Sequence, residues 1–169
     1  MTFNWGALLG WSAMTGSLDL AVVAPLYLSG ISWTLVYDTV YAHQDKADDV
    51  QVGVKSTALL FGAQTKPVLA AFSFTTIALL AASGYFNQSS YLFYTIACGA
   101  GSAHLFWLLR GVDLNSTASC WKAFTSYSWF GFIVFFALVC DYSYRSFFNP
   151  KQPEENILVH NTHPYATDK

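Results

Sequence analysis

Long apolar segments alternate with short polar connections along most of this chain. Five segments stand out, over residues 3–14, 20–42, 67–86, 91–109 and 123–142. They are too continuous for barrel strands, which alternate apolar and polar positions over about ten residues. A segment in lipid must satisfy its own backbone groups, so the pattern predicts an all-α, multi-pass transmembrane helical bundle of about five helices. The first segment is shorter than the roughly 20 residues of a membrane span, and we expect the shortest helix there.

Polar stretches set the expected limits of these helices. The sequence TGSLD follows the first segment, NQSS separates the third from the fourth, and RGVDLNSTASCWK precedes the fifth. After the last segment, three prolines and mixed polar residues predict a disordered tail. The expected division is therefore a transmembrane domain over 1–143 and a polar tail over 144–169. Met1 opens directly into apolar residues without a targeting presequence, and we expect a longer parent protein.

The composition supports the membrane interpretation. Charged residues make up 11% of the chain and hydrophobic residues 54%, whereas an ordinary soluble domain carries about 25% charged residues. The formal net charge is −2 and no basic patch or motif is present, which argues against a nucleic-acid partner. Cys98, Cys120 and Cys140 are far apart, and their spacing matches neither a zinc site nor a disulfide framework.

Acidic residues concentrate in the segment YDTVYAHQDKADDVQVGVKS, residues 37–56. We call it the aspartate segment, and it holds Asp38, Asp45, Asp48 and Asp49 of ten acidic residues in all. If the helix over 20–42 continues through it, Asp38, Tyr41, Asp45 and Asp49 share one helical face. Carboxylates one turn apart repel each other, so the cluster predicts a bound cation. Asp38 lies inside the apolar segment, where an ionisable residue indicates function.

Carboxylates without His or Cys favour Mg²⁺ or Ca²⁺ over zinc. Mg²⁺ usually binds one or two carboxylates together with substrate phosphates, so the segment predicts a helix-borne Mg²⁺ site for a phosphorylated ligand. Lys55 and the adjacent Ser56 offer charge and a hydroxyl to the phosphates. The alternative is a solvated helix end, which accounts well for Asp48 and Lys46. His43 could orient a carboxylate or bind phosphate.

Positive residues indicate the orientation in the membrane. If the five segments alternate, one side of the membrane receives Lys46, Lys55, Lys66, Arg110 and Lys122. The positive-inside rule puts this side, with the aspartate segment, on the cytoplasmic-equivalent face, which is the matrix in a mitochondrion. The loop over 110–122 shares this side, which places Asp113 near the aspartate site, although a solvated loop position is the simpler interpretation of Asp113. We expect His104, within the fourth segment, to form a hydrogen bond between helices.

The stretch YDTVYAHQDKADDVQVGVKSTALLFG resembles the second aspartate-rich motif of the UbiA superfamily of intramembrane aromatic prenyltransferases. Its form YAHQDKxDD…GxKSTAL is similar to the motif of the branch that prenylates 4-hydroxybenzoate in ubiquinone biosynthesis. The opening TFNWGALLGWSA is similar to the fifth helix of that branch. The resemblance implies a nine-helix fold, of which this chain supplies about the last five helices. It also implies a mitochondrial inner-membrane location, or a bacterial inner membrane as the alternative.

The resemblance assigns roles to individual residues. The family motif DxxxD falls on Asp45 and Asp49, which would hold one Mg²⁺ on the diphosphate of a polyprenyl donor. It implies catalytic roles for Asp45, Asp49 and Asp38, and substrate-binding roles for Tyr37, Tyr41, Lys55 and His43. The implied partners are polyprenyl diphosphate, 4-hydroxybenzoate, the lipid bilayer and other proteins of ubiquinone biosynthesis.

Two family elements are missing from this sequence. It contains no NDxxDxxxD motif, and its helical segments contain no YxxxK element. Three interpretations stay open: a 4-hydroxybenzoate polyprenyltransferase or a truncated form of one, a catalytically silent membrane fragment or assembly partner, and another UbiA branch. That branch would act on homogentisate, naphthoquinol precursors or haem, and the string AHQDK argues against it.

Overall fold

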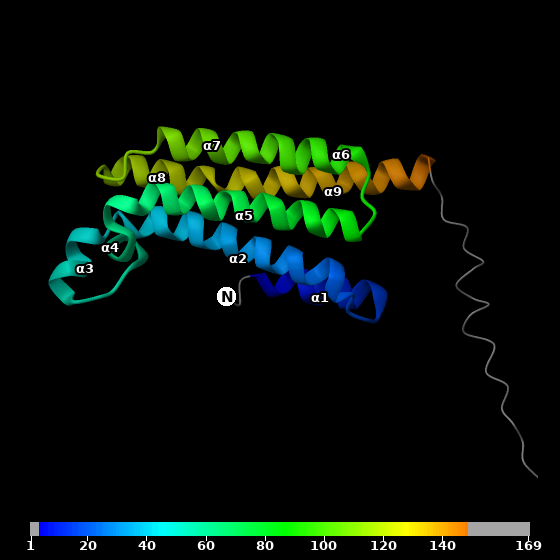
Figure 1. The fold of residues 1–169 in the computed structure, drawn as a ribbon, viewed down its shortest axis with the longest axis horizontal. Helices are drawn as coiled ribbons and strands as arrows, with labels where there is room; N and C mark the ends of the chain where they lie inside the picture. Colours follow the sequence, from blue (N-terminus) through cyan, green and yellow to red (C-terminus); the bar gives the residue numbers. More distant parts are fainter. Residues whose placement is uncertain (1–3, 149–169) are drawn as a thin grey trace, which may run out of the picture.

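The computed structural model describes residues 4–148, which are almost entirely helical and contain no strand (Figure 1). The helices are α1 (Trp5–Thr15), α2 (Leu20–Ala42), α3 (Lys46–Val52), α4 (Thr57–Phe61), α5 (Thr65–Phe86), α6 (Tyr91–Phe93), α7 (Gly101–Gly111), α8 (Thr117–Ser126) and α9 (Ser128–Phe148). A 3₁₀ turn, Gly62–Gln64, joins α4 to α5, and a π-helical segment, Tyr94–Ala100, joins α6 to α7.

Four of the helical stretches are long and apolar enough to cross a membrane: Leu20–Ala42, Thr57–Phe86, Tyr91–Gly111 and Thr117–Phe148. The expected all-α, multi-pass bundle is therefore confirmed. Helix α1 has 11 residues and is the shortest of the five expected helices. The separate helix α3, with 7 residues, is shorter still and was not expected.

Three boundaries differ from the sequence-based expectation. The third helical stretch begins at Thr57 rather than 67, and the fifth begins at Thr117 rather than 123. Helix α9 continues to Phe148, past the expected domain end at 143. The extension of α9 has a local cause, because Arg145 forms an ion pair with Asp141 one turn earlier at 2.9 Å. The expected tail lies outside the described residues from 149 onward.

Helices α2 and α5 form the central pair of the bundle (Figure 1). Small polar side chains bridge them: the Ser29 hydroxyl donates to the Thr76 carbonyl at 2.8 Å, and the Ser83 hydroxyl donates to the Val22 carbonyl at 2.9 Å. Hydrogen bonds of this kind hold helices together where no hydrophobic effect acts between them. The pair α6–α7 and the pair α8–α9 complete the bundle.

The aspartate segment and the connection between α7 and α8 lie at one end of the bundle, and the turn between α5 and α6 lies at the other (Figure 1). At this second end Asp141 is only 1% exposed. Its carboxylate accepts the Ser90 backbone N–H at 2.5 Å and pairs with Arg145, which also donates to the Asn87 carbonyl. Asp141 thus fixes α9 to the α5–α6 turn.

Candidate functional site

The aspartate segment is split between two helices. Helix α2 ends at Ala42, the chain turns through residues 43–45, and α3 begins at Lys46. The expected end of the second helix beside HQDK is confirmed, but the expected single helical face is wrong. Asp38 and Tyr41 belong to α2, whereas Asp45 is the N-cap of α3 and Asp49 lies in its first turn.

The charge of the segment gives a physical reason for the break. The C-terminal end of a helix carries partial negative charge, so carboxylates added to the end of α2 would be repelled. The break instead places Asp45 at the N-cap of α3 and Asp48 and Asp49 in its first turn, at the positive end of a new helix. The same residues that predict a cation site therefore also stop α2.

Asp45 and Asp49 lie one turn apart on α3. The Asp49 N–H donates to the Asp45 carbonyl oxygen at 2.8 Å, which places both side chains on the same side of this helix. Asp45 and Asp48 are exposed, and Asp49 is partly exposed. Within residues 4–148 none of these three carboxylates forms a hydrogen bond or an ion pair, so all are available to a ligand.

The site has two carboxylates, those of Asp45 and Asp49, that could bind a metal ion. Among the described residues no group of three or more His, Cys, Asp or Glu side chains is placed to hold a metal ion. A pair of carboxylates fits Mg²⁺, which completes its coordination with water and substrate phosphates. Within the segment, Gln44 Nε2 and Ser56 Oγ are buried and have no hydrogen-bond partner among the described residues.

The chain after α3 folds back on it. Gly53 has a φ of 76°, a conformation that side chains with a Cβ rarely adopt, and the Val54 N–H donates to the Asp49 carbonyl at 2.9 Å. Lys55 follows this turn, and its side chain is exposed. Asp38 is also exposed, and it lies one turn before the end of α2 rather than deep inside a longer helix.

Aromatic side chains form a continuous strip along α2. The ring of Trp33 lies 5.1 Å from that of Tyr37, measured between centroids. The ring of Phe124 on α8 lies 5.9 Å from Tyr37 and 4.9 Å from Tyr41. Positions 33, 37 and 41 recur at one-turn intervals, and this spacing is the signal in the sequence that could have identified Trp33 as a further candidate. We call these four rings the aromatic strip.

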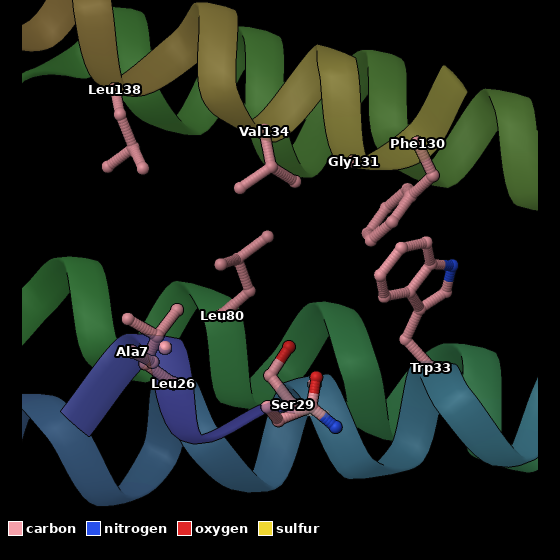
Figure 2. Close-up of a pocket in the computed structure, with 12 residues that line it drawn as sticks. Ala7, Leu26, Ser29, Trp33, Leu80, Phe130, Gly131, Val134 and Leu138 are labelled. Carbon is pink, nitrogen blue, oxygen red and sulfur yellow. The ribbon is translucent and has the colours of Figure 1, made fainter. Parts of the chain in front are cut away.

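The aromatic strip leads into an apolar groove of about 360 Å³. Figure 2 shows Val134 of α9 pointing toward Leu80 of α5, Leu138 of α9 pointing into the groove on the side of Ala7, and Trp33 and Phe130 packed at the other end. Their rings lie 5.5 Å apart. The groove is also lined by Asn4, Gly6, Ala7, Leu26, Ser29, Gly30 and Gly131. Trp33 thus belongs both to the groove and to the aromatic strip, which continues along α2 to Tyr41 in its last turn.

His43 belongs neither to the lining of this groove nor to the aromatic strip. It is 8% exposed, its Nδ1 bonds to the Thr39 carbonyl at 2.9 Å, and it lines a second pocket together with Lys46 and Asp113. Asp113, which was expected near the aspartates, is exposed and lines this pocket, and none of the four aspartates of the segment lines it. His104 bonds through Nε2 to the Ser126 carbonyl at 3.1 Å, which confirms the expected hydrogen bond between helices.

Comparison with known proteins identifies relatives along most of the chain. The model of the UbiA prenyltransferase family matches residues 1–144. A mitochondrial 4-hydroxybenzoate polyprenyltransferase of Arabidopsis thaliana is 50% identical over 145 residues, which cover 86% of this chain and 35% of the relative. The protein of the same name in Homo sapiens is 50% identical over 139 residues, covering 82% and 37%.

A third relative extends the match into the last residues. The 4-hydroxybenzoate polyprenyltransferase of Drosophila melanogaster is 42% identical over 166 residues, which cover 98% of this chain and 42% of the relative. The chain therefore spans well under half the length of these curated relatives. No solved structure matches it.

Proposed function

The chain belongs to the UbiA prenyltransferase family, and from this premise we propose that it forms part of the active site of a 4-hydroxybenzoate polyprenyltransferase of ubiquinone biosynthesis. The observation that carries the proposal is the apolar groove from which the aromatic strip runs along α2 to Tyr41, in the last turn before Asp45. It would hold a long hydrocarbon chain with its diphosphate directed toward Asp45 and Asp49. The names of the relatives from Arabidopsis thaliana, Caenorhabditis elegans and Homo sapiens support the substrate assignment.

The proposed reaction joins a prenyl carbon to an aromatic ring. The bond between the prenyl carbon and the diphosphate oxygen breaks, a bond forms to the ring carbon ortho to the hydroxyl of 4-hydroxybenzoate, and the ring proton leaves. The diphosphate departs with the bonding electrons, so groups that bind its negative charge favour the step. Asp38, exposed one turn before the end of α2, would interact with the polar substrate end.

Asp45 and Asp49 would hold Mg²⁺ in this proposal, and the ion supplies charge neutralisation for the departing diphosphate. Lys55 would add a charge-assisted hydrogen bond to the same phosphates. Tyr37 and Tyr41 would line the path of the prenyl chain, where the π electrons of their rings favour positive charge. The groove lined by Leu80 and Phe130 would hold the distal part of the prenyl chain.

The proposed location follows from the relatives and from charge. The relatives' names place those proteins in mitochondria, and the apolar helices suit a membrane. We propose the inner membrane with the aspartate segment facing the matrix, because Lys46, Lys55 and Lys66 gather at that end of the bundle. Other proteins of ubiquinone biosynthesis are the proposed neighbours at this surface.

The proposal is tested in a chimera in which this chain replaces the matching region of the Homo sapiens relative. Asp45→Ala and Asp49→Ala should each lower prenyl transfer about a hundredfold or more, since each removes a metal ligand. Asp48→Ala is the matched control, because this adjacent exposed carboxylate lies outside the DxxxD pair, and its loss should be much smaller. Near-normal turnover by either of the first two variants at saturating Mg²⁺ would refute the proposal.

A further inference from the structure

The pocket beside His43 lies at the same end of the bundle as the aspartate segment but is separate from it. Its volume is about 340 Å³, and it lies between the end of α2, the start of α5 and the α7–α8 connection. Lys46, Lys66 and Asn115 are among its lining residues, and none of the four aspartates of the segment lines it. The pocket is therefore a second polar site, outside the proposed active site.

The charge of this pocket is predominantly positive. Lys46 and Lys66 enter it from α3 and α5, and between residues 4 and 148 neither ammonium group forms an ion pair or a hydrogen bond. The N-terminus of α5, a helix of 22 residues, adds partial positive charge. Asp113 is the single acidic residue in the lining, and its carboxylate already accepts the Asn115 N–H at 3.0 Å. An anion is the ligand that these groups would attract.

His43 adds a hydrogen-bond acceptor to the wall. The Thr39 carbonyl can only accept, so the His43 Nδ1 must carry the proton of the bond between them. The Nε2 of the neutral ring is then an acceptor, and it has no partner among the described residues. An acceptor beside two ammonium groups suits a ligand that carries a hydroxyl next to its negative charge.

We propose that this pocket binds a phosphate group, with the headgroup of an anionic glycerophospholipid as its natural source. The phosphate lies between Lys46 and Lys66, and a glycerol hydroxyl donates to His43 Nε2. Basic pockets between transmembrane helices, on the side where positive residues gather, are suited to such headgroups. The lipid would hold the end of α2 against the start of α5 and so steady the turn that carries Asp45.

The test uses the complete 169-residue chain in detergent micelles and native mass spectrometry. Retention of phosphatidylglycerol is compared with that of phosphatidylcholine, and inorganic phosphate is added as a competitor. Lys46→Gln with Lys66→Gln removes the charge of the pocket, and Ala63→Leu fills its space while leaving the charge intact. Arg110→Gln is the matched control, because this exposed cation lies at the same end of the bundle and does not line the pocket. Circular dichroism checks that each variant keeps its helices.

We expect phosphatidylglycerol to be retained in preference to phosphatidylcholine. The double lysine variant and Ala63→Leu should each weaken this retention about tenfold or more, whereas Arg110→Gln should leave it unchanged. Displacement of the lipid by inorganic phosphate would show that the pocket also takes free phosphate, and resistance to displacement would show that it selects the lipid. Equal retention of the two lipids, or a double variant that behaves like Arg110→Gln, would overturn the proposal.

Discussion

At the scale of single residues, two kinds of aspartate have opposite environments in this chain. Asp45 and Asp48 are exposed at the start of a short helix, with no partner in the described part of the chain. Asp141 is buried and has its charge satisfied by Arg145 and the Ser90 N–H. Buried charges with complete partners stabilise structure, whereas exposed carboxylates without partners are available to ligands. The exposed aspartates are visible in the sequence as a cluster. The role of the buried one is not, because Asp141 stands alone in an apolar segment.

Asp141→Ala should lower the free energy of unfolding by about 1–3 kcal/mol, because the partly buried Ser90 N–H loses its acceptor. Arg145 would lose its ion-pair partner in the same variant. The measurement is thermal unfolding in detergent micelles, followed by helical circular dichroism. Asp48→Asn is the control for a missing carboxylate, and it should change stability by less than about 0.5 kcal/mol. Equal melting curves for the two variants would mean that Asp141 does not hold α9 in place.

At the scale of helices, the length of an apolar segment predicts that a helix exists better than it predicts where that helix begins and ends. The runs over 20–42 and 91–109 become helices almost as expected, because their ends coincide with breaks in apolar character. Apolar character does not reveal the start at Thr57, since TALLF is separated from the next apolar run by the polar residues GAQTK. It does not reveal the break between α2 and α3 either, because helical periodicity continues through residues 43–45. Helix-end charge decides against a continuous helix, and a count of apolar positions does not include that effect.

Sequence periodicity does not predict which residues of neighbouring helices contact each other. Gly84 on α5 is an example, because a Cβ placed there would lie 2.5 Å from the ring of Phe93 on α6. The close approach of these two helices therefore requires glycine. The aromatic strip is a similar case: the spacing of Trp33, Tyr37 and Tyr41 is visible in the sequence, but their packing on Phe124 is not.

Gly84→Ala should destabilise the bundle by about 1–3 kcal/mol, the usual range for overpacking a filled contact. Gly10→Ala, in α1, is the matched control, because a Cβ at this position meets no heavy atom within 4 Å. It should be neutral or stabilising, since alanine favours the helix over glycine by about 1 kcal/mol. Thermal unfolding in micelles compares the two, and an unaffected Gly84→Ala variant would show that α5 and α6 do not meet as described.

At the scale of the whole molecule, the proposed active site is open on one side. Tyr41 of the aromatic strip is 39% exposed, and Leu138 of the groove is 43% exposed. The carboxylate pair of Asp45 and Asp49 supplies two of the roughly six ligands that Mg²⁺ takes. The family resemblance assigns further metal ligands to the motif NDxxDxxxD, which this sequence does not contain. The 169 residues thus provide one wall of a site that needs another.

This geometry predicts that the 169-residue chain alone does not transfer a prenyl group. With one side of the proposed active site open, water would reach the reacting prenyl carbon and compete with the aromatic acceptor. The diphosphate would also meet only part of the positive charge that its departure requires. The purified chain in lipid vesicles, supplied with polyprenyl diphosphate, 4-hydroxybenzoate and Mg²⁺, should therefore yield prenol rather than prenylated product.

The most direct test compares prenylated 4-hydroxybenzoate formed by three proteins in the same vesicle assay: the 169-residue chain, the chimera with the Homo sapiens relative, and the chimera carrying Asp45→Ala and Asp49→Ala. We predict product from the unmodified chimera alone, because only it combines both walls of the site with an intact DxxxD pair. Product from the isolated chain, or undiminished product from the chimera without both aspartates, would contradict the proposed division of the site.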